Sequence, residues 1–452
     1  MIDTQSLKNK ILDLAIRGKL TRQLPDDGTA EELYEKIQKE KQALVEAGKL
    51  KKEKPLKEIE KDEVPFEIPE SWKWVRFGKI ISLQSGQDLT KSEYNDDGKG
   101  IPYITGASNY GESNTIYINR WTEYPKSFAQ SGDILLSCKG TVGKLAILYE
   151  TEIHIARQIM GIRTYAVNIP FVLYYLQSMI NGIKEAQKGL IPGIERNDVL
   201  SLMCPLPPVV EQKRIVEKVE ILFAEIDTIE KLQNQYAADA EILKSKLIDA
   251  AIQGKLTEQL PSDGTAEELY QQIQTEKQAL ISAGKIKKEK PLKEIEEDEI
   301  PFEIPESWKW VRLEQVTYSV GNKTNQIKTN DVKPDGEIPV VSQGQKMIDG
   351  YCDEKEKIIT DIPLVMFGDH TRIVKYIDFP FVIGADGTKF HHCISVNPKY
   401  FYYWMLHATA VLRDKGYARH YSLLKKQLIP LPPMAEQKRI VEVIERLFKV
   451  FA

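Results

Sequence analysis

The stretch that decides the fold opens with PLPPVVEQKRIVEKVEILF (205–223) and closes with LKSKLIDAAIQGKL (243–256). Its apolar residues are separated alternately by four and three positions, at Ile215, Val219, Leu222, Ile226 and Ile229. This spacing keeps one narrow apolar stripe on one side of a helix. The stretch therefore predicts a long helix that packs against another helix as a coiled coil.

The stripe continues less regularly through Leu232, Tyr236, Leu243 and Leu247. No proline or glycine stands between Pro208 and Gly254, so about 45 residues form a rod of roughly 65 to 70 Å. The prolines before Val209 are compatible only with a helix start, and Gly254 is a suitable stop. An ordinary core helix is the alternative, but such a length without internal caps favours the coiled coil.

The partner helix is expected in the same chain, in two pieces. PLPPMAEQKRIVEVIERLF (430–448) repeats the start of the rod, and LKNKILDLAIRGKL (7–20) repeats its end. The corresponding seam residues are Ile440, Ile444 and Leu447 in the first piece and Leu7, Ile11 and Leu14 in the second. We expect an antiparallel coiled coil with a pseudo-twofold internal repeat and neighbouring termini, which would tolerate circular permutation. A parallel or intermolecular coil is the alternative.

Composition limits the possible functions. The 452 residues suffice for several domains, and the formal net charge of −4 excludes a protein that coats nucleic acid by bulk charge. Any DNA-binding surface must therefore be local. No apolar run approaches a membrane span and MIDTQSLKNK has no signal-peptide core, so we expect a cytoplasmic protein. The four cysteines have neither close pairing nor metal-type spacing, which predicts reduced thiols.

A segment is duplicated almost letter for letter, from Glu40 to Arg76 and from Glu276 to Arg312. Upstream of each copy, Thr29 with Glu32 and Thr265 with Glu268 form predicted capping boxes of a helix. The lysine runs 49–57 and 285–293 offer contacts to DNA phosphates, but interleaved glutamates favour a solvated face. Two nearly identical copies predict two equivalent places to attach.

Each duplicated segment leads into a mixed α/β module that begins near a tryptophan pair, Trp72 and Trp74 in the first, which we assign to the core. DILLSCKGTVGKLAIL (133–148) predicts a hairpin, and IPFVLYYLQSMINGI predicts a helix starting near Pro170. In the second module, IPLVMFGDHTRIVKYI and NPKYFYYWMLHATAVL take these places. The scaffold is closely duplicated, whereas the modules have diverged.

The fold class is therefore α+β, with two mixed α/β modules separated by a long antiparallel helical coiled coil. The predicted domains are an N-terminal coil segment at 1–20, connecting arms at 21–71 and 257–307, modules at 72–207 and 308–432, a central helix at 208–256, and a C-terminal helix at 433–452.

Several motifs resemble specificity subunits of type I restriction-modification systems. They are the repeated PLPP-x-x-EQKRIV, AIQGKL after the rod, PFEIPESWKWVRL before the second module, GDILLSCKGTVGKLAIL and GDHTRIVKYIDFPF. The resemblance covers essentially the whole chain. It implies that each module is a target-recognition domain for one half of a bipartite asymmetric DNA site, separated by a spacer that the coil sets. It also implies two modification subunits that use S-adenosylmethionine to methylate adenine, and ATP-driven restriction subunits.

The residues themselves indicate a non-catalytic chain that carries no cofactor. The sequence has no GxGxxG, no GxxxxGK[ST] and no Asn/Asp-Pro-Pro-aromatic motif, and GTVGK at 140–144 is too short for a phosphate loop. We predict no metal at His391, His392 and Cys393, because adjacent side chains on a strand point to opposite faces. Catalysis is thus assigned to partners. The competing hypothesis is a coiled-coil scaffold whose two modules bind proteins.

Candidates for DNA binding are side chains that pair with base edges and lie in turns. For each of them a phosphate contact is as well supported as a base contact. In the first module they are Gln87, Thr90, Lys91, Lys139, Thr141, Lys144, Arg157, Gln158, Lys188 and Arg196. In the second module they are Asn322, Lys323, Gln343, Gln345, His370, Thr371, Arg372, Lys389, Arg419, His420 and Lys425. Arg214 and Arg439 of EQKRIV offer a basic patch too, but their place on the coil favours packing.

Overall fold

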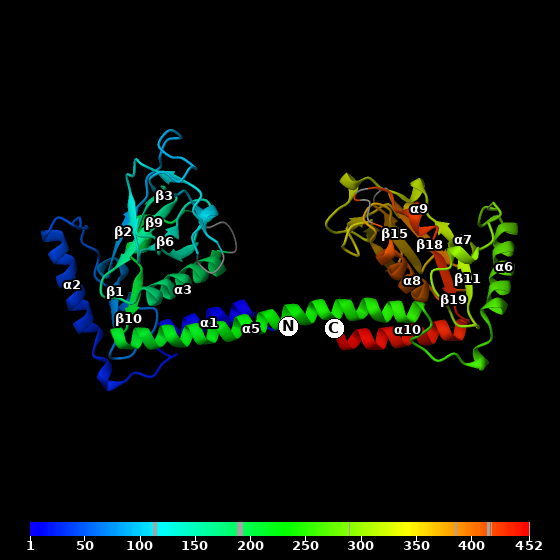
Figure 1. The fold of residues 1–452 in the computed structure, drawn as a ribbon, viewed down its shortest axis with the longest axis horizontal. Coiled ribbons are helices and arrows are strands. Elements are labelled where there is room, and N and C mark those ends of the chain that lie inside the picture. Colours follow the sequence, from blue (N-terminus) through cyan, green and yellow to red (C-terminus); the bar gives the residue numbers. More distant parts are fainter. Residues whose placement is uncertain are drawn as a thin grey trace. The chain divides into compact units, whose positions relative to one another are not determined.

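The computed structural model describes residues 1–451 apart from 112–114, 188–192, 289, 385–386, 414–415 and 417, and no side chains between 181 and 187. The chain divides into two compact units, unit 1 (Met1–Asn234) and unit 2 (Gln235–Ala452). Each unit combines helices with small mixed sheets, which confirms the predicted α+β class (Figure 1).

Helix α5 (Val209–Ile252) is 44 residues long and uninterrupted, as the sequence predicts. At about 1.5 Å per residue it measures roughly 66 Å. It ends just before Gly254, whose φ of 71° is the left-handed conformation typical of a helix C-terminus. In the part of the chain that the structure describes, no helix is both long and apolar enough to span a membrane.

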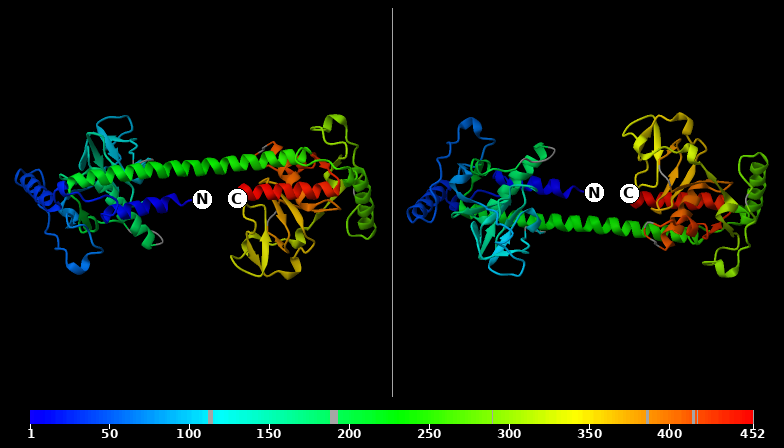
Figure 2. Two further views of the ribbon diagram at one scale, coloured as in Figure 1. Left: turned by 90° about the horizontal axis from the view of Figure 1, so that it is seen from below. Right: turned by 90° about the horizontal axis from the view of Figure 1, so that it is seen from above.

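In unit 1, α1 (Thr4–Ile16) packs beside the first half of α5 and runs in the opposite direction (Figure 2). Ile2 donates its backbone N–H to Gln233 over 2.9 Å. Lys8 pairs with Asp227 at 2.5 Å, and the following Thr21 reaches back to Glu211. Residue numbers therefore rise along α1 while they fall along the facing part of α5, so the two helices are antiparallel.

In unit 2, α10 (Met434–Phe448) packs in the same way against the second half of α5 (Figure 2). Tyr236 donates its hydroxyl to the carbonyl of Val450, and the ammonium of Lys244 lies 5.9 Å from the ring centre of Phe448. The pairing predicted from the repeats is therefore antiparallel within each unit.

The buried stripe differs from the predicted seam at its ends. Leu7, Leu232, Tyr236 and Leu243 are 41%, 64%, 57% and 49% exposed. Beyond Tyr236 the buried positions of α5 are instead Ala240, Ile248, Ala251 and Ile252, and those of α1 are Leu12, Ala15 and Ile16. The reason is geometric: a straight helix drifts away from a strict seven-residue repeat, and the modules cover a second sector of each helix.

The module of unit 1 joins its coil through a two-stranded antiparallel sheet of β1 (Lys73–Arg76) and β10 (Met203–Leu206). One four-stranded sheet has the order β2-β9-β6-β7 and another β4-β3-β8-β5. Their strands are β2 (Ile81–Ser85), β3 (Ile101–Ile104), β4 (Trp121–Thr122), β5 (Phe128–Gln130), β6 (Ile134–Ser137), β7 (Leu145–Ile147), β8 (Glu152–Ile155) and β9 (Ile159–Thr164). Helices α3 (Ile169–Gln187) and α4 (Arg196–Leu200) complete it, and β6 with β7 form the predicted hairpin.

The module of unit 2 is built on the same plan. Strands β11 (Lys309–Arg312) and β19 (Leu428–Leu431) form the junction sheet, followed by sheets of order β12-β18-β15-β16 and β14-β13-β17. Their strands are β12 (Thr317–Val320), β13 (Ile338–Val341), β14 (Gly350–Cys352), β15 (Leu364–Gly368), β16 (Val374–Ile377), β17 (Val382–Ile383) and β18 (Thr388–Cys393). The helices are α7 (Leu313–Val316), α8 (Pro398–Val411) and α9 (Tyr421–Leu424).

The inner strands of the two modules share one register. Lys73 pairs with Leu206 in unit 1, and Lys309 with Leu431 in unit 2. In the next sheet Leu83 lies opposite Ile162, whereas Ser319 lies opposite His391. A buried isoleucine in unit 1 therefore corresponds to a buried histidine in unit 2.

Each arm contains one α-helix, α2 (Ala30–Glu46) in unit 1 and α6 (Ala266–Ser282) in unit 2, and both predicted capping boxes are present. After α2, residues 47–60 run along the surface of the module and form neither helix nor strand. Arg76 fixes this segment by donating to the carbonyls of Lys57 and Glu58. Trp72 is buried as predicted, whereas Trp74 is only half-buried, and all four cysteines are buried and free.

Candidate nucleic-acid interface

The EQKRIV repeat faces the arm of its own unit. In unit 1 the guanidinium of Arg214 donates to both carboxylate oxygens of Asp27, at 2.6 and 2.5 Å. In unit 2 Arg439 does the same to Asp263, at 2.8 and 2.6 Å. These pairs lower the pKa of each aspartate. The arginines are therefore engaged in packing, which agrees with the interpretation that the sequence favours.

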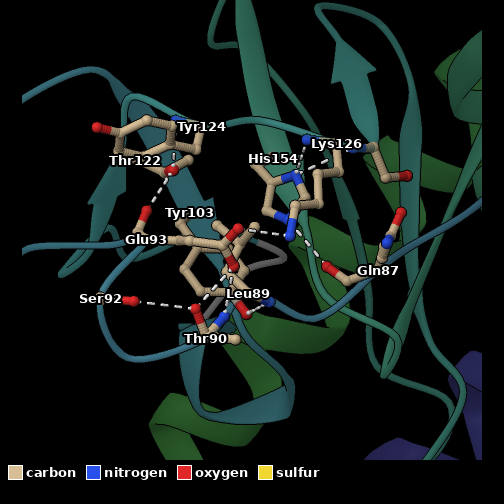
Figure 3. A network of polar contacts seen from close by, with 11 residues as sticks. Gln87, Leu89, Thr90, Ser92, Glu93, Tyr103, Thr122, Tyr124, Lys126 and His154 are labelled. Carbon is tan, nitrogen blue, oxygen red and sulfur yellow. Dashed lines mark hydrogen bonds and ion pairs between the residues drawn. The ribbon is translucent and has the colours of Figure 1, made fainter.

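The loop after β2 carries Gln87, Thr90 and Lys91, all exposed. A network of polar contacts holds it in place (Figure 3). The backbone N–H and the hydroxyl of Thr90 both donate to Glu93, at 2.8 and 2.9 Å. Glu93 in turn pairs with Lys126 at 2.6 Å, and this hydrogen bond is the first cause that lowers the pKa of Glu93 to about 2. The loop is thus folded around an ionised carboxylate.

His154 on β8 anchors the other end of this loop from inside the module (Figure 3). Its Nδ1 accepts the backbone N–H groups of Lys126 and Ser127, at 3.2 and 3.1 Å. We therefore assign the proton to Nε2, which donates to the carbonyl of Gln87 over 2.9 Å. Burial lowers the pKa of His154, so the ring is neutral at pH 7 and presents Gln87 in a fixed position.

Two further segments of unit 1 meet the same loop. Arg157 pairs with Asp88 at 2.8 Å and donates its backbone N–H to the same carboxylate. The backbone of Cys138 bonds to the carbonyl of Gln158, which brings the turn between β6 and β7 alongside. Eight candidate side chains are thereby gathered and exposed: Gln87, Thr90, Lys91, Lys139, Thr141, Lys144, Arg157 and Gln158. These exposed side chains therefore lie on three adjoining segments of one module.

Two candidates of unit 1 stand apart from this group. Lys188 lies outside the described residues. Arg196, at the start of α4, donates to the carbonyl of Leu83 and pairs with Glu53 of the arm at 3.1 Å. It faces the arm and is only half exposed, so it does not join the cluster of exposed turns.

In unit 2 the turn between β15 and β16 gathers a second group. The side-chain oxygen of Gln343 accepts the backbone N–H of His370 over 3.1 Å, and the hydroxyl of Thr371 donates to the carbonyl of Gln343 over 2.8 Å. Arg372 adopts a positive φ of 59° and donates to the carbonyl of Leu412. Gln345 is exposed nearby in sequence. The turn thus brings together the amide of Gln343, the hydroxyl of Thr371 and the guanidinium of Arg372.

Lys389 and Lys425 flank one aromatic ring. Their ammonium groups lie 5.5 and 5.9 Å from the ring centre of Tyr421, and Lys425 also pairs with Glu314 at 2.6 Å. Asn322 and Lys323 lie in a different loop, where Asn322 caps the turn through Thr324. Arg419 is exposed. The structure therefore divides the candidates of unit 2 among separate loops.

His420 is a correction to the sequence interpretation. Its side chain is fully buried, and its backbone N–H and its Nδ1 both lie within hydrogen-bond distance of the carbonyl of Asp369, at 2.9 and 3.1 Å. The carboxylate of Asp369 accepts the backbone N–H of Tyr421 at 2.7 Å. His420 therefore shapes the loop from inside and cannot reach a base in this conformation.

The comparisons with known proteins identify the family. A family model described as "Type I restriction modification DNA specificity domain" matches residues 69–236 and 305–452. The two matches together cover well over half of the chain. This chain belongs to that family.

Among curated relatives of these specificity domains are two subunits from Escherichia coli. The EcoEI specificity subunit is 32% identical over 69% of this chain, which spans 61% of that protein's length. The EcoAI specificity subunit is 26% identical over 98% of this chain and 89% of that protein. Each family match contains one of the two modules described above.

Solved structures similar to this specificity-domain chain include two subunits. The HsdS subunit from Thermoanaerobacter tengcongensis is 22% identical over 51% of this chain and 54% of that one, with a TM-score of 0.34. The type I restriction-modification S subunit from M. genitalium is 15% identical over 85% and 93%, with a TM-score of 0.33.

Sequence reasoning missed the acidic residues that shape these specificity domains. Asp88 orients Arg157, and Asp369 joins the turn after β15 to α9. Asp133 binds Arg163 through two hydrogen bonds of 2.8 Å. Asp133 lies directly before β6, whereas Asp369 lies directly after β15, so their common GD sequence stands at opposite ends of corresponding strands and gave no shared signal. Among the described residues, no group of three potential metal ligands occurs.

Proposed function

We propose that this chain is the DNA-specificity subunit of a type I restriction-modification complex, active in the cytoplasm on double-stranded DNA. Each module reads one half of a bipartite, asymmetric site. The coiled coil sets the unread spacer and docks two modification subunits, which methylate adenine at N6. Restriction subunits join the full complex. The chain itself is non-catalytic and takes no cofactor.

One observation carries this proposal: the two family matches fall on modules that share a scaffold but present different loops. In unit 1 the candidate surface combines lysines, Arg157 and glutamines on three adjoining segments. In unit 2 the turn after β15 presents Gln343 and His370 instead. Arginine, lysine and glutamine are the side chains that read base edges in pairs. Different loops on equivalent supports suit two different half-sites.

Methylome sequencing tests the proposal directly. The chain is co-expressed with its modification subunit in a host that lacks other adenine methyltransferases, and N6-methyladenine is mapped. We expect a split, asymmetric motif that disappears when this chain is omitted. Exchanging residues 72–207 for the module of a relative should alter only one half of that motif. Methylation that persists unchanged without the chain would refute the proposal.

A further inference from the structure

A groove of about 950 Å³ lies in unit 1 between the arm and the module. Residues 48–54 of the arm form one wall. The end of β2, the start of β5 and the first turn of α4 form the others. All of its lining residues belong to the described part of the chain.

The groove is locally basic in a chain whose net charge is −4. Three of its cations are already paired: Lys126 with Glu93, Arg163 with Asp133 and Arg196 with Glu53. The arm adds Lys49, Lys51, Lys52 and Lys54, which are exposed and have no ion-pair partner among the described residues. Their positive charge is therefore available to a ligand.

The arm is held firmly enough to present these lysines. On its N-terminal side, the ammonium of Lys41 donates to the carbonyls of Gly78 and Ile81. Burial lowers the pKa of Lys41 to about 8, while Glu53 at 3.9 Å counteracts part of that shift. On its C-terminal side, Arg76 binds the carbonyls of Lys57 and Glu58. The lysines thus lie on a segment anchored at both ends.

A comparison of the two arms shows which of their exposed residues are constrained. Four exposed residues of α2 differ from their counterparts in α6: Glu35, Lys36, Lys39 and Glu46 correspond to Gln271, Gln272, Thr275 and Ser282. By contrast, residues 47–60 differ from 283–296 only at Leu50, which corresponds to Ile286. Packing does not require identical exposed lysines. Their identity therefore points to a ligand that is the same for both units.

The sugar-phosphate backbone is such a ligand, because it does not change when the base sequence does. The groove also continues toward the candidate base-reading turns, since Gln84 and Ser85 line it and lead directly into the loop with Gln87. We propose that Lys51, Lys52 and Lys54 bind DNA phosphates beside the first half-site, and that Lys287, Lys288 and Lys290 do so beside the second. This inference rests on the proposed function and assigns sequence-independent affinity to the arms.

The test compares two double variants that remove the same charge from one arm. K51Q/K52Q changes the groove, and K36Q/K39T changes α2 to resemble its own repeat. Each is prepared as the complex with the modification subunit, and binding to a target duplex is measured by fluorescence anisotropy from 50 to 200 mM salt. Losing two phosphate contacts should lower the salt slope by about 1.8, so the wild type loses about 12-fold more affinity over this range than K51Q/K52Q. K36Q/K39T should retain the wild-type slope.

Further measurements keep the outcomes distinct. K287Q/K288Q should lower the slope to a similar extent, and the methylated motif should stay the same in every variant. A wild-type slope in K51Q/K52Q would overturn the inference. So would weaker assembly with the modification subunit at an unchanged slope, because the segment would then be a protein-docking surface. A wild-type complex without sequence preference would instead refute the proposed function.

Discussion

In each unit, helix, arm and module meet at a junction, and the hydrogen bonds of the two junctions are nearly the same. The loops that the two modules present differ. The carboxylate of Glu211 is fully buried and accepts hydrogen bonds from Trp72 at 2.8 Å and Gln23 at 2.8 Å. Glu436 accepts from Trp308 at 2.8 Å and Gln259 at 2.9 Å. No such correspondence links the His154 network to the turn after β15.

The next residue of the repeat is equally matched. Gln212 donates to the carbonyl of Pro207 and accepts the backbone N–H of Asn168, and Gln437 makes the same two bonds to Pro432 and Asn397. Together with Glu211 and Glu436, these glutamines join helix, arm and module in each unit. The comparison shows that the Glu-Gln pair of the repeat is required by contacts that join helix, arm and module. The loops at the far side of each module take no part in these contacts, so their sequences can differ.

The largest expected effect comes from breaking one junction. Glu211→Ala would leave the buried indole N–H of Trp72 without an acceptor and remove one of the three acceptors of the Gln23 amide, and should cost about 3 kcal/mol. Glu436→Ala should cost the same in unit 2. Hydrogen exchange of β1 and β11 measures each loss, with the exposed Glu217→Ala as control. A clearly unequal cost would show that the two junctions are not equivalent.

A medium effect is expected where the units differ, at His391 of unit 2 and its counterpart Ile162 of unit 1. Burial is the first cause that lowers the pKa of His391 to about 3, and Lys425 and Lys389 add to the shift. In the unfolded chain this histidine takes up a proton near pH 6.5, whereas in the folded chain it stays unprotonated until the pH falls to about 3. Stability of unit 2 is therefore full above pH 6.5 and falls on acidification, by roughly 2 kcal/mol between pH 7 and pH 5.

His391→Ile is the matched test, because unit 1 already carries isoleucine at this place. The variant should remove this pH dependence, measured as hydrogen exchange of β12 and β18 at both pH values. It should not destabilise at pH 7, since the Nε2 of His391 has no hydrogen-bond partner among the described residues. An unchanged acid sensitivity in the variant would assign the effect to other groups.

Local signals made much of this fold predictable. The four-three spacing from Ile215 to Ile229 predicted α5, and Thr29 with Glu32 predicted the start of α2. The exposure of Leu243 was not predictable, because it depends on which sector of α5 the neighbouring elements cover. The spacing of apolar residues predicts that a helix forms, but which side of that helix is buried depends on its packing against neighbouring elements.

The types of residue that form the candidate interface could be predicted from the sequence, but their burial and their neighbours in the fold could not. Polar residues in turns pointed to Gln87 and Arg157, which the fold brings together. Nothing local distinguished His420, which is buried, from the exposed Arg419 beside it. The orienting role of Asp88 likewise arises from a contact between distant segments. Burial and pairing of this kind are tertiary properties.

A smaller effect is expected from removing either capping box. Thr29 and Thr265 each accept the backbone N–H of the glutamate three residues later, both at 3.3 Å. Thr29→Ala and Thr265→Ala should each cost about 1 kcal/mol of local stability. Hydrogen exchange of the first turns of α2 and α6 measures this. If only one of them responds, the equality of the two arms does not extend to their stability.

The smallest effect on stability should come from a position at which the two copies of the repeat carry different residues. Lys8 and Lys244 lie 5.8 and 5.9 Å from the ring centres of Phe223 and Phe448, in corresponding positions. Lys8 also pairs with Asp227, whose place in the repeat is taken by Ala452. Because Asp227 is largely exposed, Asp227→Ala should cost at most about 0.5 kcal/mol, and less at high salt. Hydrogen exchange of α1 at low and high salt measures this. A loss above about 1 kcal/mol would mean that the ion pair, and not the shared contact between lysine and ring, fixes α1 on the coil.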